Sequence, residues 1–291
     1  MHIKDAIERF VCQQAADGRS PHTVAQYGRH VRLFAAWLRR GGHTGDVARI
    51  DHDTVARFLT APAARTNAHG GEKAATSVNC LRTSLKVFAA YLHRAGHAAE
   101  DAGRLIRRAV CSSPPPRVLS DAECDRLRAA LAAQEGAEGR RDAALFGLML
   151  EAGIRLNSAL ALDVDDVDLE RGELRLRRTK GDRPVVVCLG AAARQDLAPY
   201  LATHAGGPLF AARHGGRPSA RHVQRRFSEL VKKAGIGWSP TPHTLRHTFA
   251  TRLYRRTGDV YLVKEALKHR FIGSTLIYAR PDVERLRAAL G

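Results

Sequence analysis

The stretch TPHTLRHTFAT, residues 241–251, decides how the C-terminal part of this chain is interpreted. It places His243 and Arg246 three residues apart, so that on a helix both side chains project from one face. Such a pair sets a hydrogen-bond donor or base beside a permanent cation. A His-x-x-Arg pattern arises often by chance in a chain rich in both residues, so the evidence lies in the ordered set around it.

Four further residues complete this ordered set. Arg155 follows a glycine where one helix is expected to give way to another, and Lys180 lies in a Thr-Lys-Gly turn. His269 and Tyr278 follow, nine residues apart. Phosphoryl transfer at a DNA backbone needs an in-line nucleophile, cations for the non-bridging oxygens and an acid for the leaving oxygen. Because a phenol has a pKa of about 10, a tyrosine nucleophile needs a base and cations nearby, and this set contains both.

The composition is that of a globular protein with a polyanionic partner. The 291 residues suffice for two domains, and 47 Lys+Arg against 29 Asp+Glu give a net charge of +18. A surplus of this size favours nucleic acid, with a basic solubility surface as the alternative. No apolar run approaches the ~18 residues that span a bilayer, and no signal peptide is evident. We therefore expect no contact with a membrane.

The cysteines and the missing cofactor motifs narrow the chemistry further. Five cysteines are scattered and form no Cys-x-x-Cys pair, which predicts reduced thiols in a cytoplasmic protein. The chain shows neither a P-loop nor a carboxylate cluster, so we expect no metal, no cofactor and no ATP.

Apolar residues at helical spacing predict an all-helical bundle over residues 1–110. Its second helix is expected to begin at Ser20, with proline next, and to stop at Gly41-Gly42. The small and polar residues of the segment 61–71 predict an irregular loop.

A second domain is expected after a proline-rich linker over residues 111–118. It covers residues 119–291 and opens with a capping box formed by Ser120 and Glu123. Helical spacing dominates it, so the fold class is mainly α.

This second domain also carries strand signals. The segments 173–178 and 184–189 alternate or are β-branched, and Gly181-Asp182 between them indicates a hairpin turn. We expect a small antiparallel β-sheet here, with another short strand at 208–210.

Polar residues on three helices are candidates for DNA contact. Their spacing places them in rows on outer helix faces, and they are His22, Gln26 and Arg29; Asn79, Arg82 and Lys86; and Arg221, Arg225 and Lys232. The third row lies opposite an apolar face on a helix expected from residue 219 to 234, where arginine could read guanine in the major groove. An ordinary solvated face is the alternative for each row.

At these motifs the chain resembles the tyrosine recombinases of the phage integrase family. Residues 241–251 are similar to the family's second box, and Gly153-Ile154-Arg155 to its first. Thr179-Lys180-Gly181 resembles the lysine-bearing hairpin, and the spacing from His269 to Tyr278 matches the last histidine-to-nucleophile spacing. The resemblance covers essentially the whole chain and implies the simple, Xer-like two-domain type, with a SAM-like core-binding domain before the catalytic domain.

The resemblance implies a role for each residue of the set. Tyr278 would form a 3′-phosphotyrosyl bond, and His243 would help remove the tyrosine proton. Arg155 and Arg246 would hold the scissile phosphate, and His269 would hydrogen-bond a phosphate oxygen. Lys180 would protonate the departing 5′ oxygen. It further implies site-specific recombination of double-stranded DNA by a tetrameric synapse, through a Holliday junction. The free protein could be a monomer.

Three departures from the family pattern stand close to these residues. Ser158 occupies a position that is usually acidic, Lys268 replaces the usual glycine before the last histidine, and residues 270–273 replace a small polar run. None removes a catalytic atom.

Two other functions use the same residues. A type IB topoisomerase-like enzyme would relax DNA without a target site, and a catalytically silent relative would only bind DNA. The family-like N-terminal domain and an apolar tail stripe of Val283, Leu286 and Leu290 favour recombination. In the family such a tail packs on a neighbouring protomer, with intramolecular packing as the alternative.

Overall fold

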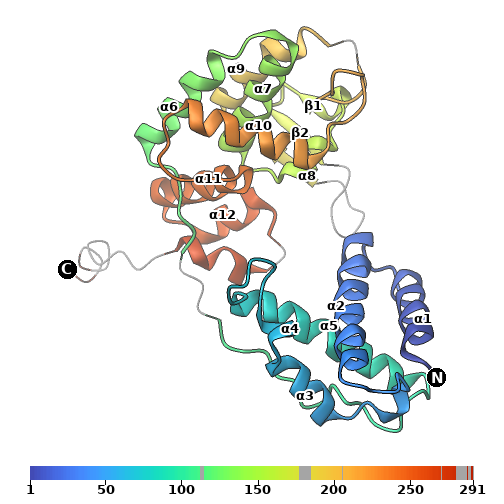
Figure 1. Ribbon diagram of the computed structural model, residues 1–291. Coiled ribbons are helices and arrows are strands. Elements are labelled where there is room, and N and C mark those ends of the chain that lie inside the picture. The colour runs from blue at the N-terminus through green and yellow to red at the C-terminus, as the bar shows by residue number, and fades with distance from the viewer. Residues whose placement is uncertain are drawn as a thin grey trace. The chain divides into compact units, whose positions relative to one another are not determined.

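The chain forms two compact units, Met1–Ser113 and Pro114–Gly291 (Figure 1). The computed structural model describes residues 1–111, 115–176, 185–204, 206–269, 271–279, 287 and 290. The expected fold class is confirmed, because a helical first unit precedes an α-rich second unit that carries one small antiparallel sheet. No helix in these described ranges is both long and apolar enough to cross a membrane.

The first unit is a bundle of helices closed around aromatic side chains. Its helices are α1 Ile3–Ala16, α2 Pro21–Arg40, α3 His52–Thr60, α4 Pro62–Arg65 and α5 Ala75–Arg94. The Ser20 hydroxyl accepts from the Thr23 amide and caps α2, as its sequence predicts. The rings of Phe10 and Phe88 meet edge to face at 5.2 Å, and both side chains are buried.

The segment 61–71 differs from the irregular loop that was expected. Its first part is the short helix α4, with Pro62 at the first helical position and Ala64 buried in the core. The rest of the segment folds back on itself, because the side-chain carbonyl oxygen of Asn67 accepts hydrogen bonds from the main-chain amides of His69 and Gly71.

Asn79 corrects the prediction of a DNA-contact row on α5. Its side chain is only 2% exposed and points into the unit instead of outward. Its Nδ2 donates to the carbonyl oxygen of Ala109 at 2.8 Å, and its Oδ1 accepts from the Ala109 amide at 2.9 Å. Arg82 donates to the same Oδ1. Asn79 therefore fastens the end of the first unit to α5 and has no face for DNA.

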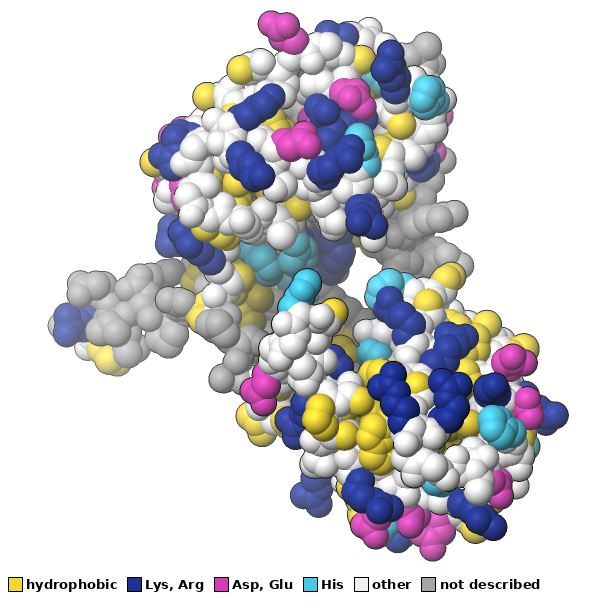
Figure 2. Space-filling model, viewed as in Figure 1, with side chains coloured by type: hydrophobic (Ala, Val, Ile, Leu, Met, Phe, Trp, Pro, Cys, Tyr) yellow, Lys and Arg dark blue, Asp and Glu magenta, His cyan; other side chains and the backbone are white. Residues whose placement is uncertain are grey.

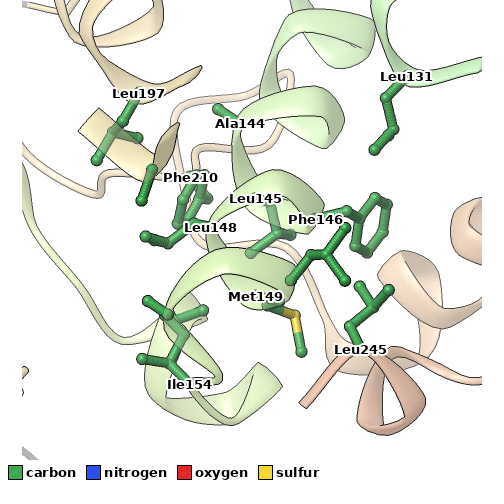
Figure 3. Close-up of a cluster of buried hydrophobic side chains, with 14 of the residues drawn as sticks. Leu131, Ala144, Leu145, Phe146, Leu148, Met149, Ile154, Leu197, Phe210 and Leu245 are labelled. Carbon is green, nitrogen blue, oxygen red and sulfur yellow. The ribbon is translucent and has the colours of Figure 1, made fainter. Parts of the chain in front are cut away.

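The second unit is built around one buried helix. Its helices are α6 Asp121–Ala132, α7 Gly136–Ala152, α8 Leu156–Leu160, α9 Ala191–Leu201, α10 Ala220–Lys233, α11 Pro242–Thr257 and α12 Val260–Leu267. Figure 3 shows Leu145, Leu148 and Met149 of α7 amid Phe210 and Leu245 from other elements. Because α7 is apolar on nearly every side, it can be covered on all of them. The capping box of Ser120 and Glu123 opens α6 as predicted.

A polar cluster inside this core fixes α10 against α7. Arg141 and Asp142 are both buried, and Arg141 Nη2 lies 2.7 Å from Asp142 Oδ1. Arg226 of α10 also donates to Asp142, and it pairs with Glu138 at 3.4 Å. Removing one partner would leave a buried charge uncompensated. We infer that the cluster fixes the orientation of α10 relative to α7.

The sheet has the antiparallel order β1-β2-β3, with β1 Val167–Asp168, β2 Glu173–Leu176 and β3 Val185–Cys188. Leu174 pairs with Val187, and Leu176 pairs with Val185. The two expected strands therefore pair in antiparallel fashion, and the expected turn at Gly181-Asp182 lies outside the described residues. The strand expected at 208–210 is absent, because Pro208 forms only a single bridge with Asp163.

We expect Asn79→Ala to lower the stability of the first unit by about 1–3 kcal/mol, because the Ala109 main chain and Arg82 lose their partner. Thermal unfolding followed by circular dichroism would show the lower midpoint. Gln26→Ala, at a partly exposed position on α2, is the control and should leave the midpoint unchanged. An unaltered midpoint for Asn79→Ala together with weaker DNA binding would restore the original prediction.

Candidate active site

The site begins where α7 ends, at Gly153. This residue has a φ of +62°, a left-handed conformation that favours glycine. A Cβ atom here would lie 2.3 Å from Cδ1 of Phe249, so the close approach of α11 also requires glycine. The chain then turns at once into α8, with Arg155 at its N-cap position. The Gly-Ile-Arg sequence thus ends one helix and begins the next within three residues.

Arg246 is the buried cation of the site. It lies on α11, is 3% exposed, and donates to the carbonyl oxygens of Gly153 at 2.5 Å and Leu267 at 2.7 Å. Burial and then the charge of Arg155 lower its pKa to about 10, so it remains charged at neutral pH. Among the described residues, both of its hydrogen bonds go to neutral carbonyls and none to a carboxylate. A buried charge of this kind suits an anionic ligand.

Arg155 adds a second positive charge to the same place. Its side chain is exposed, yet after burial its charge contributes to the lowered pKa values of His243, Arg246 and His269, and it opposes the raised pKa of Tyr278. Residues from the start of α8, from α11 and from beyond α12 therefore share one electrostatic environment. These residues form one positively charged cluster, which we call the pocket.

Three histidines line this pocket and are neutral at pH 7. Loss of water around the ring and the charges of Arg246 and Arg155 lower the pKa of His243. Burial is also the largest cause that lowers the pKa values of His247 and His269 to about 4. The Nδ1 of His269 lies 2.8 Å from Oγ1 of Thr275, which fixes its ring. Figure 2 shows histidine side chains grouped at the lower edge of the second unit.

Tyr278 enters the pocket from the last described turn, Leu276–Tyr278. Its side chain is 6% exposed and belongs to a small apolar cluster with Ala250, Val263 and Leu267. Its hydroxyl nevertheless lies 2.7 Å from Nδ1 of His247. Burial raises its pKa against the lowering effect of the two arginines, so the free enzyme holds a protonated phenol.

The backbone conformation at Lys268 is one that suits the glycine usual at this position in the family. It ends α12 with φ 50° and ψ 47°, and within the described ranges it is the only residue other than glycine with a positive φ. This conformation costs a lysine about 1 kcal/mol or more, and a glycine would adopt it freely. The turn therefore carries strain directly before His269.

The structure brings five of the six expected catalytic residues into one pocket: Arg155, His243, Arg246, His269 and Tyr278. The sixth expected catalytic residue, Lys180, lies outside the described residues. So does Arg270, the first residue of the stretch that departs from the family's small polar run. The ends of the segment that contains Lys180 are paired, since Leu176 and Val185 face each other in the sheet.

His247 was missed by sequence reasoning. Two signals pointed to it: it directly follows Arg246, and it lies one helical turn after His243. The two histidine rings meet edge to face at 4.5 Å. Neither signal could reveal its bond to Tyr278, 31 residues later.

All candidate DNA-contact residues other than Asn79 lie at the surface of their unit. His22, Arg29 and Lys86 are exposed, Gln26 and Arg82 are partly exposed, and Arg221, Arg225 and Lys232 are exposed on α10. Figure 2 shows Lys and Arg side chains gathered on the visible face of the first unit. These positions fit phosphate contact.

Comparison with known proteins decides the family. The phage integrase family matches residues 117–285, and the phage integrase N-terminal SAM-like domain matches residues 7–96. The chain belongs to the phage integrase family. Its activity is site-specific recombination of the tyrosine recombinase type.

Curated relatives match over nearly the full length. Tyrosine recombinase XerC of Chromobacterium violaceum is 32% identical over 290 residues, which cover 98% of this chain and 92% of that protein. Tyrosine recombinase XerD of Mycobacterium tuberculosis (strain H37Rv) is 30% identical over 288 residues, with 93% and 90% covered. The chain therefore aligns with Xer-type members of the family over most of its residues and most of theirs.

Solved structures show the same fold. XerH recombinase bound to its difH substrate before cleavage superposes with a TM-score of 0.73 at 22% identity, covering 92% of this chain and 79% of that one. A lambda integrase (75–356) dimer bound to a COC′ core site gives 0.72 at 19% identity, with 94% and 96% covered.

We expect Gly153→Ala to destabilise the protein by several kcal/mol and to abolish DNA cleavage, because the new Cβ meets Phe249 and displaces the carbonyl that holds Arg246. Gly235→Ala is a matched control, since Gly235 also has a φ of +62° but no neighbour within 4 Å. It should cost only the backbone strain of about 1 kcal/mol and keep cleavage. Equal losses of thermal stability in both variants would show that the contact with Phe249 is unimportant.

Proposed function

We propose that this recombinase breaks a DNA strand with Tyr278, inside a pocket formed by the same subunit. The supporting observation is that the Tyr278 hydroxyl lies among His247, Arg246 and Arg155 of its own chain. The hydroxyl is shielded yet hydrogen-bonded, which suits a nucleophile that must attack only at a bound phosphate. Two arginines close to it, neither of which pairs with a carboxylate of the described residues, supply the complement of a phosphodiester.

In the proposed step the Tyr278 oxygen attacks the scissile phosphorus and the bond from phosphorus to the 5′ oxygen breaks. The phenolic proton passes to His243, and Lys180 donates a proton to the leaving 5′ oxygen. Arg155 and Arg246 neutralise the non-bridging oxygens, and His269 donates a hydrogen bond to one of them. The products are a 3′-phosphotyrosyl bond and a free 5′ hydroxyl, and reversal on a new 5′ end rejoins the strand.

The proposed domains divide the contacts with DNA. Residues 1–110 would act as the core-binding domain through His22, Gln26, Arg29, Arg82 and Lys86. Residues 119–291 would act as the catalytic domain, with α10 supplying Arg221, Arg225 and Lys232 to the major groove. Residues 111–118 would link them. The net charge of +18 supports extensive phosphate contact.

Assembly on the recombination site would produce a tetramer that passes through a Holliday junction, acting in the cytoplasm on nucleoid DNA. Support comes from apolar side chains exposed on α12 and in the turn before Tyr278, namely Tyr261, Leu262, Leu276 and Ile277. A soluble monomer rarely leaves such a group uncovered. A lambda integrase tetramer bound to a Holliday junction shares the fold with a TM-score of 0.71 at 18% identity.

The test is covalent capture on a nicked suicide substrate. Wild-type protein should give a denaturant-resistant adduct, and Tyr278→Phe should bind the DNA but give none. Arg155→Ala should slow adduct formation by about 10²–10³-fold at saturating DNA, because a donor to the reacting phosphate is lost. Arg155 is the cleaner target, since its side chain is exposed while Arg246 also supports the fold.

Arg171→Ala serves as the matched control, because Arg171 is an exposed arginine on the turn before β2. It should cleave at the wild-type rate. Adduct formation by Tyr278→Phe would refute the proposed nucleophile, and an undiminished rate in Arg155→Ala would refute the cationic pocket.

A further inference from the structure

We propose that His247 is a positioning residue that accepts a hydrogen bond from the Tyr278 hydroxyl and thereby aims the nucleophile at the phosphate. This inference rests on the proposed function, in which Tyr278 is the nucleophile. It adds a residue that stands outside the six expected catalytic residues.

The geometry places His247 next to the nucleophile and holds it there. Its Nδ1 lies 2.7 Å from the Tyr278 oxygen, and the two ring centres are 5.6 Å apart. On its other side the ring of His243 packs edge to face at 4.5 Å, with an interplanar angle of 82°. Because α11 carries both histidines one turn apart, the His247 ring is fixed between a helix neighbour and the nucleophile.

The two partners have definite roles in this bond. The pKa of His247 is lowered to about 4 and that of Tyr278 is raised above its usual 10, so both are neutral at pH 7. A neutral phenol has one hydrogen to give, and a neutral imidazole has one nitrogen to accept it. Which of the two atoms donates depends on the tautomer of His247, and the proposal assigns the one in which Nε2 carries the ring hydrogen and the hydroxyl donates to Nδ1.

In the free enzyme the lowered pKa of His247 favours positioning over proton transfer. Transfer of the phenolic proton to a group with a pKa near 4 is strongly unfavourable, so His247 cannot hold that proton in the free enzyme. It can fix the direction of the O–H bond, which otherwise rotates about the Cζ–O bond. The bond to Nδ1 holds the oxygen before attack with a lone pair facing the phosphorus; during attack the O–H bond turns from His247 to His243, which takes the proton.

Two substitutions distinguish the roles that His247 could have. His247→Asn keeps an acceptor oxygen near the position of Nδ1 but cannot take up a proton. His247→Phe keeps a flat ring but has no acceptor. Both are assayed in the full-length protein for the rate of adduct formation at saturating suicide substrate, and for the Kd of the recombination site.

We expect His247→Phe to form adduct about tenfold more slowly and His247→Asn to stay within about threefold of wild type, with the Kd unchanged in both. An unchanged rate for His247→Phe would overturn the proposal. Equal losses in both variants would indicate a proton acceptor instead, and a larger loss in His247→Asn than in His247→Phe would indicate simple ring packing. Either result overturns positioning by hydrogen bonding.

A second measurement avoids any folding defect of His247→Phe. Nitrogen-15 NMR of the imidazoles in DNA-free wild-type protein should show Nδ1 of His247 without a proton at pH 7, with the resonance assigned by its loss in His247→Asn. This resonance should shift in Tyr278→Phe, because the donor is gone. A protonated Nδ1, or no shift, would overturn the proposal.

The failures of the two proposals are distinguishable. An adduct formed by Tyr278→Phe would refute the nucleophile itself, whatever the His247 variants do. Absence of that adduct together with full activity of His247→Phe would refute only the role of His247.

Discussion

The pocket depends on one buried interaction, the pair of hydrogen bonds from Arg246 to the carbonyl oxygens of Gly153 and Leu267. These bonds join α11 to the ends of α7 and α12. Each carbonyl ends a helix, where main-chain oxygens lack a partner within the helix and carry partial negative charge. The guanidinium is therefore buried here against carbonyl oxygens, with no carboxylate of the described residues beside it, and its positive charge is left for a ligand.

The electrostatics of the other residues follow from this arrangement. Burial, and after it the positive charge nearby, lowers the pKa values of His243, His247 and His269 and keeps the three rings neutral, so that each has a nitrogen able to accept. The same charge opposes the effect of burial on the Tyr278 phenol. When a phosphodiester enters, its negative charge offsets the arginines, so the pKa values of the histidines rise. Proton uptake at His243 then becomes easier at the moment when the substrate is in place.

Much of this could be predicted from the sequence, because local chemistry specifies it. Helix starts at Ser20 and Ser120 are set by side-chain caps, and the αL end at Gly153 needs glycine. The catalytic residues could be recognised in order from the sequence, because each lies in a short local motif of the family. The predictions that failed concern residues whose partners are far away in the sequence. Asn79 looked like an outer-face residue, but its partner Ala109 lies 30 residues away. The His247–Tyr278 bond spans 31 residues and has no local signature.

The central claim is that nucleophile and cationic pocket belong to one subunit, and mixing two inactive variants tests it most directly. Tyr278→Phe retains the pocket, and Arg155→Ala retains the nucleophile. Equal amounts of the two would be assembled on full recombination sites that contain a suicide nick, and covalent protein–DNA adduct would be measured. Our account predicts no more adduct than Arg155→Ala gives alone. A mixture that forms adduct at a rate near that of wild type would show that tyrosine and pocket come from different subunits, and would contradict the account.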